Sequence, residues 1–112
     1  MTKDDMHVVA YKVLTYLYQC LKNGVKPNIK QAQKLCEINP LYWNAVIDNC
    51  IDRGLVKAPF KSPFKDVYDD LQITLDGVEY LEDAKPMNRV KQTIGEAFEV
   101  VLKSAIEVSK LC

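Results

Sequence analysis

The sequence has few of the residues that most catalytic sites need. It contains a single histidine, His7, only four glycines and no glycine-rich phosphate-binding loop. A catalytic serine or cysteine needs a neighbouring base, and no motif of that kind surrounds any serine or cysteine of the chain. These absences predict a protein that is not an enzyme and holds no cofactor.

Close cysteine pairs are lacking as well. Zinc sites usually draw their ligands from such pairs, and no Cys-x-x-Cys motif occurs. Three of the four cysteines fall on apolar helix faces, where a free cysteine packs as a small hydrophobe. We therefore expect structural core cysteines, with neither a metal nor a disulfide. The four are Cys20, Cys36, Cys50 and Cys112.

No apolar run is long enough to cross a bilayer. The most apolar stretch, residues 8–21, is interrupted by Lys12, Thr15 and Gln19. The charged N-terminus has no small-residue cleavage site of the kind that ends a signal peptide. The sequence therefore predicts a cytoplasmic protein with no membrane partner.

The chain has no excess of either charge. Its 15 lysines and arginines balance 15 aspartates and glutamates. Because sequence-independent DNA affinity comes from cations that neutralise phosphates, this balance counts against DNA binding. The charges are uneven, however, with lysines gathered in residues 26–38 and 56–66 and carboxylates in residues 67–85. The acidic segment has no calcium-loop spacing, so we expect a solvated surface there.

What the chain does contain fits one globular domain, residues 1–112. Apolar residues recur at helical spacing. Asn28 and Asn39-Pro40 are typical helix starts, and Gly54 is a typical helix end. The predicted fold is mainly α with a small β-wing (α+β), a winged helix-turn-helix with a long C-terminal helix. The predicted elements are a first helix (1–23), a helix-turn-helix (28–54), a wing (55–73), a short helix capped by Thr74 (74–85) and a C-terminal helix (88–110).

Two motifs carry a family resemblance. Residues 73–81 have the form apolar-Thr-x-x-Gly-x-x-Tyr-Leu, which is common after the wing strand of winged-helix regulators. Residues 51–56, which end the helix-turn-helix, also match those proteins. Nearly the whole chain resembles the YjcQ-like family of small bacterial and prophage proteins. The resemblance implies the winged-helix fold, and because that family is functionally uncharacterised it implies no mechanism.

The second helix of the helix-turn-helix is the candidate DNA-reading element. Such a helix should offer Arg, Lys, Asn or Gln to the bases. Here Asn44 and Asn49 could read adenine, and Tyr42 could touch a phosphate. Asp48 and Asp52, later in the helix, would repel the DNA backbone. A structural or protein-facing helix is therefore the alternative.

Lysines on both sides of that helix could add phosphate contacts. Lys30 and Lys34 belong to the preceding helix, and Lys57 begins the wing. A doubled Pro-Phe-Lys unit in the wing adds Lys61 and Lys65, with phenylalanines that could stack on bases or fill the core. Solvated lysines are the alternative. The full candidate nucleic-acid-binding set is Lys30, Lys34, Tyr42, Asn44, Asn49, Lys57, Lys61 and Lys65.

The first and last helices have more apolar surface than a winged-helix core covers. They could pack on each other, or they could form a two-fold dimer that places two recognition helices on successive half-sites. The candidate dimer interface is Tyr11, Tyr18, Phe98, Val101 and Ala105.

The leading hypothesis is a dimeric regulator of phage or prophage type that binds double-stranded DNA. The alternative is a protein-interaction module that kept the winged-helix scaffold and lost its basic face. The charge of the helix-turn-helix face in three dimensions separates them. If Asp48 and Asp52 lie on that face, the alternative gains.

Overall fold

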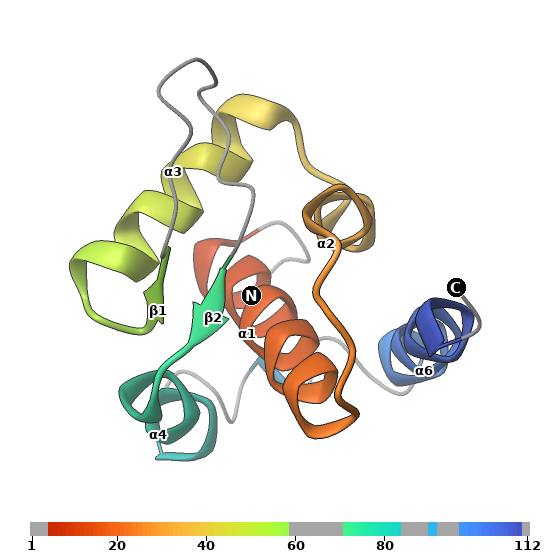
Figure 1. The fold of residues 1–112 in the computed structure, drawn as a ribbon. Coiled ribbons are helices and arrows are strands. Elements are labelled where there is room, and N and C mark those ends of the chain that lie inside the picture. Colours follow the sequence, from red (N-terminus) through yellow and green to blue (C-terminus); the bar gives the residue numbers. More distant parts are fainter. Residues whose placement is uncertain (1–4, 59–70, 84–89, 92–96, 111–112) are drawn as a thin grey trace.

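A computed structural model of the chain describes residues 5–58, 71–83, 90–91 and 97–110. These residues are mostly helical and include a small two-stranded antiparallel sheet (Figure 1), so the prediction of a mainly α fold with a small β element is confirmed. The elements, with two further helical residues at 90–91, are α1 (Met6–Lys22), α2 (Ile29–Cys36), α3 (Pro40–Asp52), β1 (Val56–Lys57), β2 (Gln72–Ile73), α4 (Leu75–Asp83) and α6 (Ala97–Lys110).

Helix α1 is the centre of the fold. It contacts α2, α3, α4, α6 and β2, which surround it in Figure 1. A helix covered from several sides needs a wide apolar arc, and the sequence of α1 supplies one. It ends at Asn23 and Gly24, where Gly24 adopts a positive φ of 67° that glycine tolerates without strain. The buried residues of α1 are Val8, Val9, Ala10, Val13, Leu14, Tyr16, Leu17 and Cys20.

Helices α2 and α3 are each started by an asparagine, as the sequence predicts. The Asn28 side chain accepts a hydrogen bond from the Gln31 N–H at 3.2 Å. The Asn39 side chain accepts one from the Tyr42 N–H at 2.8 Å, with Pro40 in the first turn. Only residues 37–39 separate the two helices, and this short connection fixes their relative direction.

The two predicted strands pair as an antiparallel hairpin. Val56 lies opposite Ile73 and Lys57 opposite Gln72, which places the two apolar residues in the core and the two polar residues in solvent. The ladder is short: it spans residues 56–57 and 72–73, near the two ends of the predicted wing segment 55–73. Residues 59–70, which contain Lys61 and Lys65, lie outside the described part of the chain.

Thr74 starts α4, as predicted. Its hydroxyl accepts a hydrogen bond from the Gly77 N–H at 3.0 Å and lies 2.5 Å from the carbonyl oxygen of Gly54, to which it donates. The Thr74 N–H donates to the Leu55 carbonyl at 3.0 Å. These bonds fasten the start of α4 to the segment that leads into β1.

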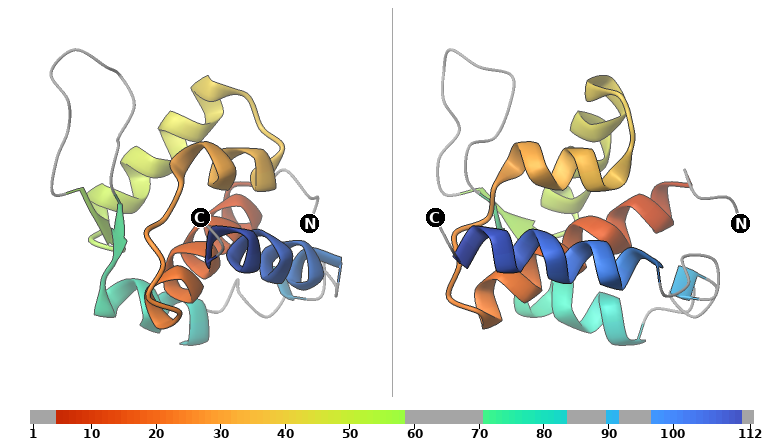
Figure 2. Two further views of the ribbon diagram at one scale, coloured as in Figure 1. Left: turned by 45° about the vertical axis from the view of Figure 1, so that its right-hand side comes forward. Right: turned by 90° about the vertical axis from the view of Figure 1, so that its right-hand side faces the viewer.

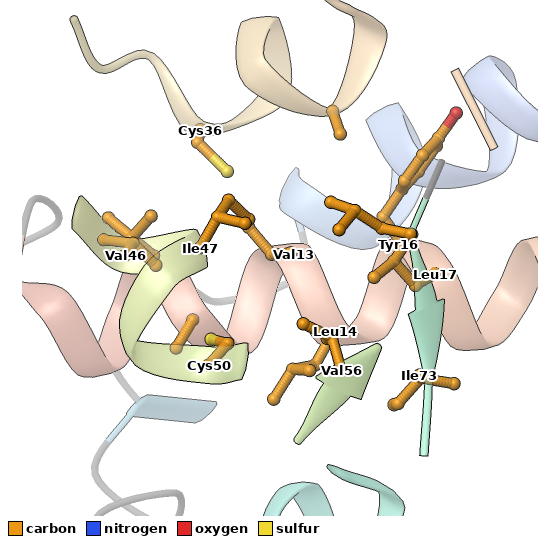
Figure 3. Packing of buried hydrophobic residues seen from close by; sticks show 14 of the residues in the cluster. Val13, Leu14, Tyr16, Leu17, Cys36, Val46, Ile47, Cys50, Val56 and Ile73 are labelled. Atoms are coloured by element: carbon orange, nitrogen blue, oxygen red, sulfur yellow. The ribbon is translucent and has the colours of Figure 1, made fainter. Parts of the chain in front are cut away.

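The cysteines of the described residues are core residues. Cys20, Cys36 and Cys50 are free and buried, as expected, and Cys112 lies outside the described residues. Figure 3 shows Cys36 of α2 pointing toward Ile47 of α3. Burial raises the pKa of Cys36 to about 12 and that of Cys50 to about 11, so both thiols stay protonated at neutral pH.

Helix α6 packs on the rest of the same chain. It runs beside α1 and α2 (Figure 2), and the Phe98 ring centre lies 6.4 Å from that of Tyr11. Phe98 is 8% exposed and Ala105 is 6% exposed. Of the two arrangements considered for the first and last helices, packing within one chain is present. The start of the predicted helix 88–110 falls partly outside the described residues.

Candidate nucleic-acid interface

Helix α3 has a clear inner side and outer side. Its buried residues are Trp43, Val46, Ile47 and Cys50. At about 100° of rotation per residue, the opposite side carries Leu41, Ala45, Asp48 and Asp52, and all four are exposed. We call these four residues the outer stripe of α3. Leu41 is 83% exposed, which is unusual for a leucine in a folded domain.

The outer stripe is apolar in its first half and acidic in its second half. Helix α3 contains no lysine or arginine, and Arg53 follows only at its C-cap. Asp48 and Asp52 lie one turn apart on the stripe. The condition that favours the alternative to DNA binding is therefore met.

The two asparagines predicted to read DNA lie on different flanks of the outer stripe. Positions 44 and 49 are five residues apart, which turns the second side chain about 140° from the first around the helix. The Asn49 side chain donates to the Ala45 carbonyl oxygen at 2.8 Å, which occupies one of its amide hydrogens. Asn49 also borders a cavity on the α1 and α4 side. The structure does not bring Asn44 and Asn49 together as one reading surface.

Tyr42 is half-buried. It packs against the hydrophobic core, and its N–H donates to the cap residue Asn39. The tyrosine therefore contributes to anchoring the first turn of α3. Its role as a phosphate contact stays a prediction.

The predicted phosphate-binding lysines of the described residues are all exposed, but none belongs to α3. Lys30 and Lys34 are one turn apart on the outer side of α2, and Lys57 lies on β1. Lys61 and Lys65 fall outside the described residues. These three exposed lysines therefore belong to the elements before and after α3 in the sequence, and none of them lies on the outer stripe.

The predicted dimer residues are also divided. Phe98 and Ala105 are buried within a single chain, so they offer little surface to a second copy. Tyr11 and Tyr18 are half-buried against the core, while Val101 is 52% exposed. Only Val101 of this set keeps most of its side chain accessible, and the homodimer stays a prediction.

Within the described part of the chain, no helix is long and apolar enough to cross a membrane. The same residues contain no group of three or more His, Cys, Asp and Glu side chains arranged to hold a metal ion.

Comparison with known proteins identifies the family. Residues 11–99 match the family described as YjcQ protein. The chain belongs to the YjcQ family. The matched range includes most of α1, all of α2, α3, the hairpin and α4, and only the first residues of α6. No curated protein and no solved structure matches the chain. This membership confirms the family resemblance seen in the sequence.

Sequence reasoning gave Leu41 no functional role. Its exposure follows from helical spacing, because it lies opposite the buried Trp43 and Val46. Spacing therefore places Leu41 on the exposed side of α3, and its 83% exposure makes it one of the most exposed large apolar side chains of the described residues.

Proposed function

We propose that this YjcQ-family protein is a protein-interaction module on a winged-helix scaffold, and that the outer stripe of α3 meets the partner. The order of helix, two closely linked helices, hairpin and helix supports the winged-helix assignment. The observation that carries the functional proposal is the composition of the outer stripe: an exposed leucine, an alanine and two aspartates, without a basic residue.

Electrostatics disfavours DNA at this surface. Duplex DNA carries one negative charge for about every 1.7 Å of its axis, so a helix lying in a groove has phosphates on both sides. Asp48 and Asp52 would approach those phosphates from α3. The chain has a formal net charge of zero, so it has no excess of positive charge to offset the repulsion. A protein partner with lysines or arginines would instead be attracted to the same carboxylates.

The stripe also fits a definite partner chemistry. Burying an exposed leucine side chain contributes roughly 1.5–3 kcal/mol, so Leu41 would act as an anchor in an apolar pocket. Ala45, one turn later, lets the partner approach the helix closely. The aspartates would then pair with a basic rim and set the orientation. The partner is thus a protein groove that is apolar at one end and basic at the other, which accepts a helix.

DNA binding is the second candidate, and a specific observation favours it. Lys30 and Lys34 are exposed on successive turns of α2, and Lys57 is exposed on the hairpin. Together they could neutralise phosphates without a contribution from the outer stripe. Binding of this kind would depend steeply on salt and little on base sequence.

A titration of labelled duplex DNA separates the two functions. Fluorescence anisotropy is followed at about 50 mM and about 200 mM salt, between which phosphate contacts give a steep loss of affinity. We expect no saturable binding at the lower salt, and we expect affinity to appear when Asp48→Lys and Asp52→Lys make α3 basic. Micromolar binding by the unchanged protein that fades with salt, and weakens further with Lys30→Ala and Lys34→Ala, would overturn the proposal in favour of DNA.

A cytoplasmic location is part of the proposal. Three cysteines of the described residues are free and packed in the core. Unpaired thiols of this kind fit a reducing compartment.

A further inference from the structure

A second surface of α3 borders a cavity that the proposed partner surface does not use. The cavity has a volume of about 190 Å³ and lies between the first turns of α1, the C-terminal half of α3 and α4. It is reached on the flank of α3 that carries Asn49, which is turned away from Leu41. Its lining residues are Met6, His7, Ala10, Val46, Asn49, Cys50, Arg53, Leu55 and Tyr80.

The floor of the cavity is apolar. Ala10, Val46, Cys50 and Leu55 are all buried residues of the core, and they come from α1, α3 and the segment before β1. None of these side chains carries a formal charge, since burial raises the pKa of the Cys50 thiol to about 11. The floor therefore favours a short apolar group over an ion or a water cluster.

The rim of the cavity is polar and carries a cation. The Arg53 guanidinium carbon lies 5.2 Å from the centre of the Tyr80 ring, a distance at which the cation is attracted to the ring face. The Tyr80 hydroxyl oxygen lies 2.8 Å from Nδ1 of His7. Tyr80 of α4 therefore contacts both His7 of α1 and Arg53 at the end of α3.

No carboxylate is among the residues that line this cavity. The Arg53 side chain also hydrogen-bonds the Tyr80 hydroxyl. A guanidinium has five N–H donors, so its other N–H groups can still bind a carboxylate, often through two parallel hydrogen bonds. We propose that the cavity binds a small organic carboxylate, with its apolar tail on the floor and its carboxylate on Arg53 at the rim. Pockets for drug-sized ligands have volumes of about 300–1,000 Å³, so this smaller cavity fits a ligand of about the size of benzoate.

A titration of the isotope-labelled protein with sodium benzoate, followed by ¹H–¹⁵N NMR, tests the assignment. We expect saturable shifts that cluster at the amides of His7, Asn49 and Tyr80, with a Kd in the millimolar range or below. Benzamide has the same shape without the charge. It should bind about tenfold more weakly or worse, because hydrogen bonds between a guanidinium and a charged carboxylate are roughly twice as strong as neutral ones.

Two variants distinguish a site from general attraction of anions. Arg53→Gln should weaken benzoate binding about tenfold or more, and the folded spectrum should remain because Arg53 is exposed. Lys22→Gln is the matched control: Lys22 also lies over a tyrosine, at 4.2 Å from the Tyr18 ring centre, but does not line the cavity. It should bind benzoate with unchanged affinity.

Three results would overturn the assignment. Benzamide binding as tightly as benzoate would show that the charge is not recognised. Unchanged benzoate affinity in Arg53→Gln, or no saturable shift up to tens of millimolar, would remove the site. Equal shifts with inorganic phosphate would show that the site binds any anion and that the apolar part of the ligand does not contribute to binding. None of these results bears on the partner surface around Leu41, so this site and the proposed function are tested separately.

Discussion

Gly77 lies so close to Leu55 that a β-carbon added to the glycine would overlap the carbonyl oxygen of Leu55. The same β-carbon would lie 2.7 Å from Cγ1 of Ile73. Since Thr74 also donates its N–H to the Leu55 carbonyl, the first turn of α4 packs directly on the main chain that enters the hairpin. The glycine is required by this close approach, and its conformation is ordinary for a helix.

We predict that Gly77→Ala lowers the free energy of unfolding by up to about 2 kcal/mol, the upper cost of overpacking less the gain in helix propensity. Overpacking typically costs about 1–3 kcal/mol, and a clash with main chain cannot be relieved by a rotamer change. The better helix propensity of alanine returns at most about 1 kcal/mol. Urea denaturation measures the difference. Gly24→Ala, where the added carbon meets nothing within 4 Å, isolates the separate cost of a positive φ. Equal stability of Gly77→Ala and the unchanged protein would contradict the packing described here.

The cap of α3 gives a second prediction. Asn39→Ala removes the oxygen that accepts from the Tyr42 N–H at 2.8 Å, and we expect it to cost about 1 kcal/mol of unfolding free energy. Asn39→Asp keeps an acceptor at the same place and should stay close to the unchanged protein. Chemical denaturation of both variants checks this. If both variants lost the same stability, the cap would not be the cause.

The buried thiols predict how stability changes with pH. The Cys36 pKa is raised by burial from about 9 to about 12, so the unfolded chain releases the proton first. The contribution of this protonated thiol to the free energy of unfolding is fully present below about pH 9. It is lost as the pH rises from there through the pKa of Cys36 in the folded protein. Urea unfolding at about pH 7.5 and about pH 10 should therefore show lower stability at the higher pH.

A cysteine variant measures the share of that decrease that comes from Cys36, since burial also raises the pKa of Cys50 to about 11. Cys36→Ala should be less stable near neutral pH, because it leaves a small cavity, yet its stability should fall less between the two pH values. Measurements stop near pH 10 because the Tyr16 pKa, also raised by burial to about 12, adds a similar effect above it. An identical decrease in Cys36→Ala would exclude Cys36 as its source.

Local chemistry made part of the structure predictable from sequence. The caps at Asn28, Asn39 and Thr74 follow from side chains that bond to main-chain groups three residues away, so a short motif contains all the information. The apolar spacing of α1 likewise predicted a helix covered from more than one side.

The remaining features depend on contacts that no local pattern records. His7 and Tyr80 are 73 residues apart in the chain, and nothing in either segment indicates that they meet. The apolar face of α6 has the same spacing whether its own chain or a second copy covers it, which is why Phe98 and Ala105 were assigned to a dimer interface. Asn49 bonds to its own helix at Ala45, an outcome that composition alone does not determine.

The outer stripe of α3 is tested most directly by site-specific photo-crosslinking in cells that naturally contain the protein. A benzophenone amino acid replaces Leu41, and in a second variant it replaces Leu75 of α4, which is 88% exposed and serves as the matched control. Asp48→Lys with Asp52→Lys is then added to the position-41 variant.

Our account predicts a discrete adduct from position 41 that protease removes and nuclease leaves intact. It should be absent from position 75 and lost when the two aspartates are reversed to lysine, because the basic rim of the partner would then be repelled. An adduct at position 41 that nuclease removes, or one that persists after charge reversal, or no adduct at all, would contradict the claim that this face of α3 binds a protein.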